Sequence, residues 1–415
     1  MLKDAQGLIV TTDSSQAIAA INRFSDQMLA YGKDAETAIL EAIGADPTCA
    51  LAHAYAAAYY LTQENRKAWQ QSLPYLQTAQ QHCAKITKRE YLYVQAISAW
   101  ANQEIDVAIA LHEKITDQFP RDLISVQQGQ YHYFYTGDKD KLCKIAQKVL
   151  PSNPKNHYLY GMVAFGLEQC HQLNAAEKIA RQAIALNRYD AWAHHAIAHV
   201  METQGRVDEG IAWMEKFADT WENCNSMLYT HNWWHIALYY LDLKNYQKVL
   251  QLYDQHIWQC ANKQSPKDQV GAISLLLRLE LRGVNVGDRW QGISPYLYSR
   301  IDEHALPFQD LHYVYALTRA GHNDWVHQML VSMQHHTFSI NPFLRRSWLE
   351  VAIPAARGMF AHAKGDFRTT IVELQPILSR LHEIGGSHAQ RVLFRQVYQD
   401  ALLAVQKQSW VYAVS

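Results

Sequence analysis

Several features that would reveal chemistry directly are scarce in this sequence, and their absence narrows the possible functions. Six cysteines are spread along 415 residues, and no two of them form a Cys-x-x-Cys pair: Cys49, Cys83, Cys143, Cys170, Cys224 and Cys260. Their scattered positions resemble those of small buried apolar residues in helices. This usage argues against a disulfide scaffold and favours a reducing compartment.

An excess of charge of one sign and a long apolar run are also missing. The chain has 38 Lys and Arg against 39 Asp and Glu, so it lacks the basic footprint of a nucleic-acid binder. The longest apolar run, Ala50 to Leu61, includes His53 and is too short to span a bilayer. Residues 1–15 hold no long apolar stretch, so we expect no signal peptide. We therefore expect a cytoplasmic protein with no nucleic-acid and no membrane partner.

Motifs of nucleophilic and nucleotide chemistry are absent as well. No Gly-x-Ser-x-Gly elbow, Walker loop or Rossmann glycine pattern stands between a strand and a helix. We find no sustained period-2 alternation of apolar residues, which excludes a sizeable β-sheet. The sequence therefore indicates an all-α protein in which sequence motifs point to no catalytic nucleophile.

A period of 34 residues is the strongest positive feature. At two helix-packing positions the period relates residues that are small or apolar except for one Gln: Ala108, Leu142, Ala176 and Gly210, and Ala96, Gln130, Ala164 and Ala198. Pro120 and Pro154 keep the same interval, and Gly137 and Gly205 are two intervals apart. Small residues at two positions, a turn between them and a proline after the second helix are typical of tetratricopeptide repeats. The period therefore predicts an all-α tetratricopeptide-repeat α-solenoid, a superhelix of antiparallel helix pairs.

The repeat also predicts the domain organisation. A compact chain of this length would normally split into domains, but a solenoid grows in one direction because each unit contacts only its neighbours. We expect one solenoid over residues 1–415. Its expected parts are regular repeats at about 89–222, degenerate repeats at 15–88 and 223–382, and a capping helix at about 387–406; the regular units start near Arg89, Leu123, His157 and Ala191.

Histidines stand where the concave groove of such a solenoid is expected. The chain has 21 His against 11 Phe. In the unit that starts at Ala191, the inward positions hold Trp192, His195, His199 and Glu202. Imidazoles four residues apart on a helix can reach one metal ion. Glu202 is then a third ligand, a partner of a ligand or a general base.

The neighbouring unit repeats this spacing with His231 and His235. Because first helices of adjacent units lie side by side, we expect these residues to converge with His195 and His199, and Tyr131 to lie on the same wall. His195, His199 and His231 are the candidate ligands of a divalent Zn, Fe or Mn ion. The plain alternative is that they are groove or core histidines, each satisfied by a hydrogen bond.

Two further segments are candidate parts of a site. Ser387 and Gln390 form a predicted capping box, which would present free N–H groups beside His388 for a carboxylate or a developing oxyanion. Asp288 and Arg289 stand in a Gly-rich connector that could close over the groove. The alternatives are a well-capped last helix with an exposed histidine, and a turn held by an Asp–Arg pair.

Four blocks of the sequence resemble the tetratricopeptide repeat protein 38 family. They are spread between residues 191 and 391: residues 191–200 running into 204–206, residues 231–235 followed by 237–239, residues 286–290 and residues 384–391. The resemblance implies a cytoplasmic, all-helical solenoid of this length. It implies no reaction or substrate.

Three functions remain open. The first is a ligand-binding solenoid whose groove of histidine and aromatic side chains holds a peptide segment or small molecule. The second is a metal-assisted or His/Glu acid–base enzyme of the hydrolase class, with its site in the same groove and with Glu202 and His388 as catalytic groups. The third is an adaptor that binds a protein on its convex face, which would require a large exposed apolar patch.

Overall fold

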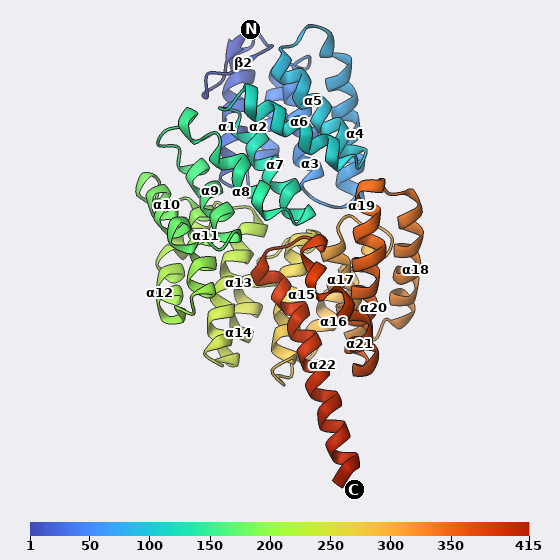
Figure 1. Ribbon diagram of the computed structural model, residues 1–415. Helices are drawn as coiled ribbons and strands as arrows, with labels where there is room; N and C mark the ends of the chain where they lie inside the picture. Colours follow the sequence, from blue (N-terminus) through green and yellow to red (C-terminus); the bar gives the residue numbers. More distant parts are fainter. Residues whose placement is uncertain (415) are drawn as a thin grey trace. The chain divides into compact units, whose positions relative to one another are not determined.

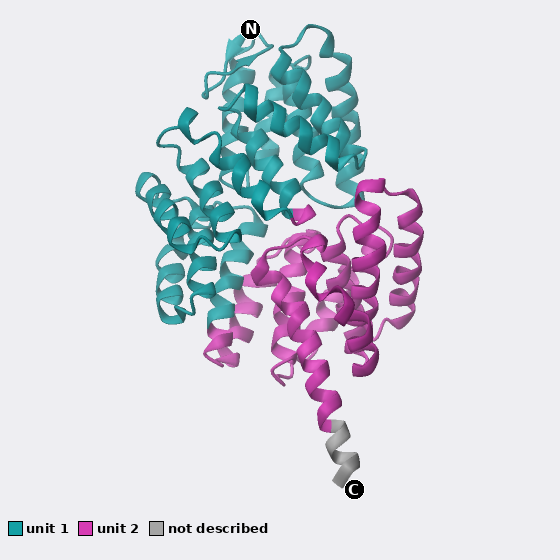
Figure 2. Cartoon of the chain, in the orientation of Figure 1, with its two compact units in different colours: residues 1–134, 138–239 teal, residues 135–137, 240–415 magenta. Residues whose placement is uncertain are grey.

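The computed structural model describes residues 1–414, with side chains through Lys407, and divides into two compact units (Figure 2). Unit 1 holds residues 1–134 and 138–239, and unit 2 holds residues 135–137 and 240–415. Nearly all regular structure in the described residues is helical (Figure 1), which confirms the predicted all-α class. The short exception is a pair of antiparallel strands, β1 (Leu2–Lys3) and β2 (Ile9–Val10).

The helices of unit 1 pack as consecutive pairs. They are α1 (Ser15–Leu29), α2 (Ala35–Ala45), α3 (Ala50–Leu61), α4 (Arg66–Gln81), α5 (Lys88–Ala101), α6 (Ile105–Gln118), α7 (Leu123–Thr136), α8 (Lys139–Gln147), α9 (His157–Gln169), α10 (Leu173–Leu186), α11 (Ala191–Thr203), α12 (Val207–Phe217) and α13 (Ser226–Asp242). Helices α1, α3, α5, α9 and α11 each pack on the next helix, and first helices of successive pairs, such as α9 and α11, also touch. This arrangement is a tetratricopeptide-type solenoid.

The 34-residue period is visible in the backbone. Helices α5, α7, α9 and α11 begin within one residue of the predicted unit starts. The turn after each first helix contains a residue with positive φ at the same repeat position: Gln103 (61°), Gly137 (77°), His171 (57°) and Gly205 (70°). Two of these four are not glycine, although a left-handed conformation is unfavourable for residues with a Cβ. Packing of the helix pair therefore imposes the turn.

Small residues at the repeat positions allow close helix packing. Ala96, Ala108, Ala164 and Ala176 are all 0% exposed. Where the repeat has Gln130 instead, the side-chain amide donates hydrogen bonds to backbone carbonyls on two neighbouring helices, so no buried polar group is left unpaired there.

Unit 2 continues with helices α14 (Tyr246–Leu252), α15 (Pro266–Glu280), α16 (Arg289–Ile293), α17 (Pro307–Arg319), α18 (Asn323–Ser339), α19 (Pro342–Ser347), α20 (Ile353–Ala363), α21 (Phe367–Leu374) and α22 (His388–Val414). Its core is built by α15 on α17, α17 on α20, and α21 on α20 and α22. Residues 135–137 belong to this unit because Tyr135 packs against Gly385. The single solenoid over residues 1–415 stays a prediction, because the chain divides into two compact units.

A buried and a partly buried charge in unit 2, Arg278 and Glu280, have hydrogen-bond partners. Arg278 donates to the carbonyl oxygens of Ser274 and Ala389. Glu280 accepts hydrogen bonds from three side chains, Trp290, Tyr315 and Arg319. These contacts offset the cost of removing the two charges from water.

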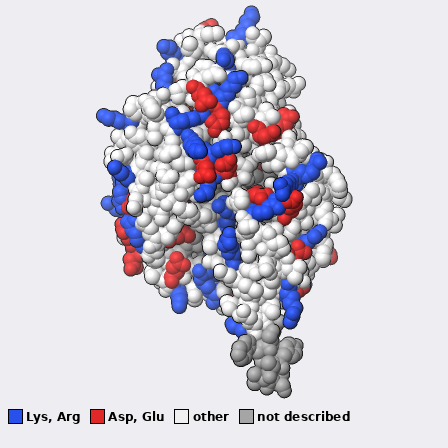
Figure 3. Space-filling model, in the orientation of Figure 1, with Lys and Arg blue, Asp and Glu red and all other residues white. Residues whose placement is uncertain are grey.

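Cysteine chemistry and charge agree with the sequence-based expectations. All six cysteines are free thiols. No helix in the described part of the chain is both long and apolar enough to cross a bilayer. Lys and Arg side chains lie among Asp and Glu side chains over the face drawn in Figure 3, so neither sign dominates that face.

Candidate metal centre

Four histidines from two first helices form the candidate site, and local capping sets where each helix begins. The Asp190 side chain accepts a hydrogen bond from the N–H of Ala193 and so caps α11. The Asn225 side chain accepts from the N–H of Leu228 at the start of α13. With the helix starts fixed, His195 and His199 lie one turn apart on α11, and His231 and His235 lie one turn apart on α13.

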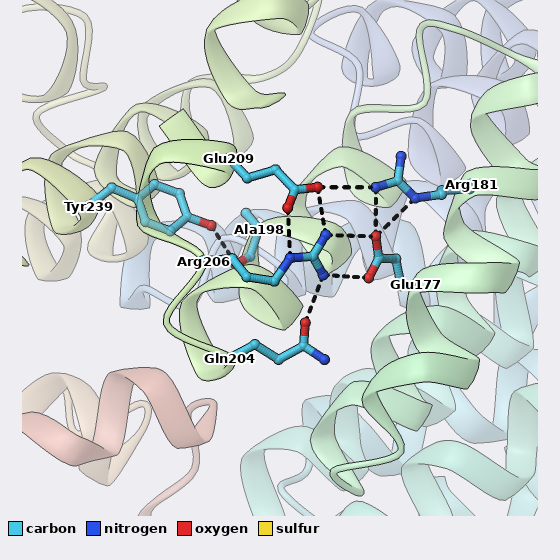
Figure 4. Close-up of polar contacts among 7 residues, drawn as sticks. All are labelled: Glu177, Arg181, Ala198, Gln204, Arg206, Glu209 and Tyr239. Carbon is cyan, nitrogen blue, oxygen red and sulfur yellow. Dashed lines mark hydrogen bonds and ion pairs between the residues drawn. The ribbon is translucent and has the colours of Figure 1, made fainter. Parts of the chain in front are cut away.

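A direct hydrogen bond holds α13 against α11. The Tyr239 hydroxyl donates to the carbonyl oxygen of Ala198 at 2.7 Å (Figure 4). Gly210 on α12 leaves room for the Tyr239 ring, since a Cβ at that position would collide with it. This contact fixes the face that α13 turns toward α11.

A charged network fixes the turn after α11 (Figure 4). Arg206 donates to Glu177 at 2.7 Å and to Glu209 at 2.6 Å. Glu177 also accepts from Arg181, so the network ties α10 to the start of α12. Several charges acting together stabilise a surface more than an isolated pair does.

The imidazole nitrogens converge between α11 and α13. Nε2 of His195 lies 3.0 Å from Nε2 of His199 and 3.1 Å from Nε2 of His231. One ring nitrogen from each of the four histidines lies within 4.8 Å of the other three. Donors on a tetrahedral zinc ion with bonds of 2.0–2.1 Å are about 3.3 Å apart. The spacing of these nitrogens is therefore close to that of a metal's ligand shell.

Burial keeps two of the rings neutral. His195, His199 and His235 are 2%, 1% and 0% exposed, while His231 is partly buried. Burial lowers the pKa of His195 well below 6.5, and the neighbouring His231 and His235 lower it further. Burial, with a smaller effect of His235, likewise lowers the pKa of His231. Neutral imidazoles keep the lone pair that a metal ion requires.

Nδ1 of His195 and Nε2 of His235 are buried and have no hydrogen-bond partner among the described residues. A buried polar atom without a partner costs free energy unless something else satisfies it. For Nε2 of His235, whose other ring nitrogen contacts Glu202, a metal ion would do so.

Carboxylates stand behind two of the histidines. Nδ1 of His235 donates to Glu202 at 3.2 Å, which leaves Nε2 of this ring for a metal ion. Oε1 of Glu168 lies 3.8 Å from Nδ1 of His199, and the Glu168 side chain is 0% exposed. Histidine ligands typically have a carboxylate or carbonyl on the nitrogen that faces away from the metal. The hydrogen bond between His235 and Glu202 has that arrangement, and Glu168 is near the corresponding nitrogen of His199.

Aromatic rings hold the histidines in place. Trp192 stacks on His195 with ring centroids 4.6 Å apart, and Tyr31 stacks on Trp192 with ring centroids 4.7 Å apart. Trp234 stacks on His231 at 5.1 Å. Rings restricted in this way lose little further freedom when they bind a ligand.

The structure brings together most of the site residues predicted in unit 1. His195, His199, His231 and His235 lie in one cluster, with Trp192 and Glu202 in contact with it. Tyr131 has other partners: its hydroxyl donates to Glu64 at 2.9 Å, and its ring packs on Trp100. Its predicted role in ligand binding stays a prediction.

Asp288, Arg289 and His388 belong to unit 2. Arg289 donates two hydrogen bonds to Asp254, at 2.9 and 2.6 Å, so its partner is not the adjacent Asp288. His388 is the first residue of α22, whose predicted capping box is present between Ser387 and Gln390. The predicted roles of these three residues at the site stay predictions.

Glu168 is a residue to which the sequence analysis assigned no role at the metal centre. The repeat itself holds the missing signal, because Glu168 and Glu202 are 34 residues apart and occupy the same position of consecutive units. The spacing of four residues from His231 was likewise sufficient to place His235 among the ligands.

No family model matches the chain. Solved structures of helical-repeat proteins are similar to it at low identity. A Rap protein complexed with competence and sporulation factor is 15% identical, with 79% of this chain and 99% of that chain covered and a TM-score of 0.46. YrrB, described as a TPR protein with an unusual peptide-binding site, is 16% identical (47% and 91% covered, TM-score 0.31). A monomeric mutant of IFIT1 with Gppp-AAAA is 12% identical, with 99% of this chain and 98% of that chain covered and a TM-score of 0.39.

Scores of this size support no argument about function. The helix pairs of unit 1 and their 34-residue period are what identify the chain as a tetratricopeptide-type repeat protein.

Proposed function

We propose that the cluster of His195, His199, His231 and His235 binds a divalent transition-metal ion, zinc before iron or manganese, and that the protein is a metal-assisted hydrolase. The observation that carries this proposal is the convergence of one ring nitrogen from each histidine within 4.8 Å. A donor set made only of imidazoles suits zinc, copper, iron or nickel better than calcium or magnesium.

Charge balance supports a divalent ion. Four neutral imidazoles bring no charge, so a buried ion would carry two uncompensated positive charges. Glu168 and Glu202, each next to a ligand histidine, supply two negative charges at short range. An ion with nearby opposite charges costs far less to bury than an isolated one.

The four ligands differ in access to solvent. Three are buried, whereas His231 is partly buried. Catalytic zinc sites keep three protein ligands and a position for water, and the metal lowers the pKa of that water to about 7. We therefore assign His231 as the ligand that water or substrate replaces. Glu202 then orients His235, and its role as a general base is secondary.

A metal-free acid–base site is less well supported. Acid–base catalysis near neutral pH needs a pKa close to the working pH. Burial moves the pKa of His195 and His231 well below 6.5, out of that range. The same shift favours metal binding, because a metal ion competes with protons for the ring nitrogen.

The ligand-binding function has its own supporting observation. Trp192 stacks on His195 and Tyr31 stacks on Trp192, and both aromatic side chains are partly exposed, so they offer apolar surface beside the centre for a small molecule or peptide segment. In this proposal the rings of Tyr31 and Trp192 position the substrate next to the metal ion. Membership of the tetratricopeptide repeat protein 38 family, proposed from the four sequence blocks, is compatible with either function.

Elemental mass spectrometry of the untagged protein tests the proposal. We expect near-stoichiometric zinc, iron or manganese in the wild type and its loss from His195→Ala and His199→Ala. His194→Ala is the matched control, because His194 lies on the same helix and is equally buried but accepts a hydrogen bond from Trp221 outside the cluster. Circular dichroism verifies that every variant is folded.

Two results would contradict the proposal. The wild type could contain no metal and take up none from added zinc, or His194→Ala could lose metal as completely as His195→Ala. With a metal present, chelation should abolish hydrolysis of amide substrates, and added zinc should restore it. Amide hydrolysis that survives complete metal removal would show that the metal ion is not the hydrolytic centre.

A further inference from the structure

Unit 2 contains a buried histidine with an acid on one ring nitrogen and a serine on the other. Nδ1 of His304 lies 2.6 Å from Oδ2 of Asp310, and Nε2 of His304 lies 2.8 Å from Oγ of Ser332. His304 precedes α17, Asp310 is in the first turn of α17, and Ser332 is on α18. No sequence motif links the three residues, so a motif search could not find them.

The arrangement suits the two hydrogen bonds that base catalysis needs. A carboxylate oxygen accepts, so Nδ1 of His304 donates to Asp310. The Nε2 lone pair of the imidazole form then faces the Ser332 hydroxyl, which donates to it. This bond to His304 is the one hydrogen bond of the Ser332 hydroxyl within the described chain. A serine whose proton points at an oriented histidine has the geometry of an activated nucleophile.

The fold holds this arrangement at a cost. His304 has φ of 49°, a left-handed conformation that side chains with a Cβ rarely adopt. Strain of this kind persists where surrounding structure requires it, and it is concentrated at functional sites. Asp310 is 1% exposed, and this burial raises the pKa of its carboxyl group, while the adjacent His304 opposes the rise. Asp310 also lies at the positive end of the α17 dipole, which favours its negative charge.

The surroundings offer both access and a further polar group. Ser332 is partly exposed, whereas His304 and Asp310 are buried. His336 follows Ser332 by one helical turn, and its ring lies 5.4 Å from that of His304 and 4.7 Å from Trp348. Nε2 of His336 is buried with no hydrogen-bond partner among the described residues. This nitrogen is the candidate donor to an oxyanion formed next to Ser332.

We propose that Ser332, His304 and Asp310 form a second reactive site, independent of the metal centre, at which Ser332 accepts an acyl group from a carboxylic ester. The Ser332 oxygen attacks the ester carbonyl carbon while its proton passes to Nε2 of His304. The imidazolium, stabilised by Asp310, returns that proton to the leaving alkoxide, so an alcohol departs and an acyl-serine remains. Water then splits the acyl-serine into a carboxylic acid and free Ser332.

Labelling of the full-length protein with an alkyl fluorophosphonate tests this assignment. In this reaction the oxygen–phosphorus bond forms, fluoride leaves, and the serine proton passes through His304 to solvent. We expect an adduct at Ser332, located by tandem mass spectrometry, and none there in Ser332→Ala. Asp310→Asn and His304→Asn should label at least about a hundredfold more slowly, since loss of the acid or base disables such sites.

The variants are chosen to separate reactivity from folding. Asn tolerates the positive φ of residue 304, and Ser339→Ala on the same helix should label as the wild type does. The assignment is overturned if native protein labels no faster than urea-unfolded protein, or if Asp310→Asn and His304→Asn label as fast as the wild type. His195→Ala should label normally, so failure of the metal centre and failure of this site give different results.

Discussion

Unit 1 contains two groups of buried histidines, and only one of them has the geometry of a metal site. His112 on α6 and His132 on α7 are 0% and 2% exposed, as deeply buried as His195 and His199. Their ring centroids are 5.7 Å apart, and both nitrogens of His112 lack a hydrogen-bond partner among the described residues. Burial alone therefore does not produce a ligand set.

The two groups differ in helix register. The four-histidine cluster uses pairs spaced by four residues on two first helices, which point their ring nitrogens at one place. His112 and His132 come from a second helix and the next first helix, and their rings pack on Tyr93 and Trp100. Register, rather than residue type or burial, distinguishes the two groups. Glu202 and Glu168 also stand behind the four-histidine cluster.

The largest expected effect compares one histidine from each group. His235→Ala removes a ligand, so the zinc affinity measured by competition with a chelating dye should fall at least about a hundredfold. His132→Ala removes an equally buried ring and should leave the zinc affinity unchanged. Equal losses in the two variants would mean that the comparison is wrong and that any buried histidine in this unit affects the metal only through folding.

The fold and the site were predictable from the sequence to different extents. The 34-residue period predicted the all-α class and the starts of α5, α7, α9 and α11, because each repeat position has the same packing partners. The spacing of His195 and His199 predicted that they share a helix face. The sequence could not give the distance between α11 and α13, since that depends on Tyr239, Ala198 and Gly210 in three dimensions.

For the same reason, the sequence could not predict the group of His304, Asp310 and Ser332 in unit 2. His304, Asp310 and Ser332 come from a turn and two helices in the irregular part of the chain, where no period fixes which residues face each other. Long-range side-chain geometry of this kind is visible only in the structure.

The second prediction breaks the contact that sets the register of the cluster. Gly210→Ala places a methyl group against the Tyr239 ring, and we expect a loss of about 1–3 kcal/mol in the free energy of unfolding from overpacking. Zinc affinity should fall with it, because Tyr239 holds α13 on α11. Gly44→Ala, at an open helical position in the same unit, is the control and should be neutral or slightly stabilising. Chemical denaturation and the dye competition measure the two effects, and an unchanged zinc affinity would count against this account of the register.

The third prediction uses the pair that binds no metal. Burial lowers the pKa of His112 to about 4, against about 6.5 in the unfolded chain. Between these values the unfolded state binds the proton and the folded state does not, so stability falls as pH falls from 6.5 toward 4. One such group contributes a loss of about 1.4 kcal/mol per pH unit in that window.

Denaturation of metal-free protein at pH 7, 6 and 5 measures this slope. In His112→Phe the dependence of unfolding free energy on pH should be weaker by the contribution of one proton. His82→Phe, which alters a histidine outside the buried group, should not weaken it. A slope that is the same in the wild type and His112→Phe would show that His112 takes up its proton without unfolding.

The smallest expected effect tests the acidic neighbours directly. Glu202→Gln keeps the shape of the side chain but removes its charge, so it weakens both the orientation of His235 and the charge balance of a bound divalent ion. Loss of such a partner typically lowers metal affinity 10–100-fold, and we expect the lower end, about tenfold, because Glu168 remains. Glu209→Gln, which alters a carboxylate bonded only to Arg206 and Arg181, is the matched control. If both substitutions changed zinc affinity equally, the effect would come from the general charge of the unit. A loss confined to Glu202→Gln would assign it to the bond with His235, which orients one ring of the converging cluster.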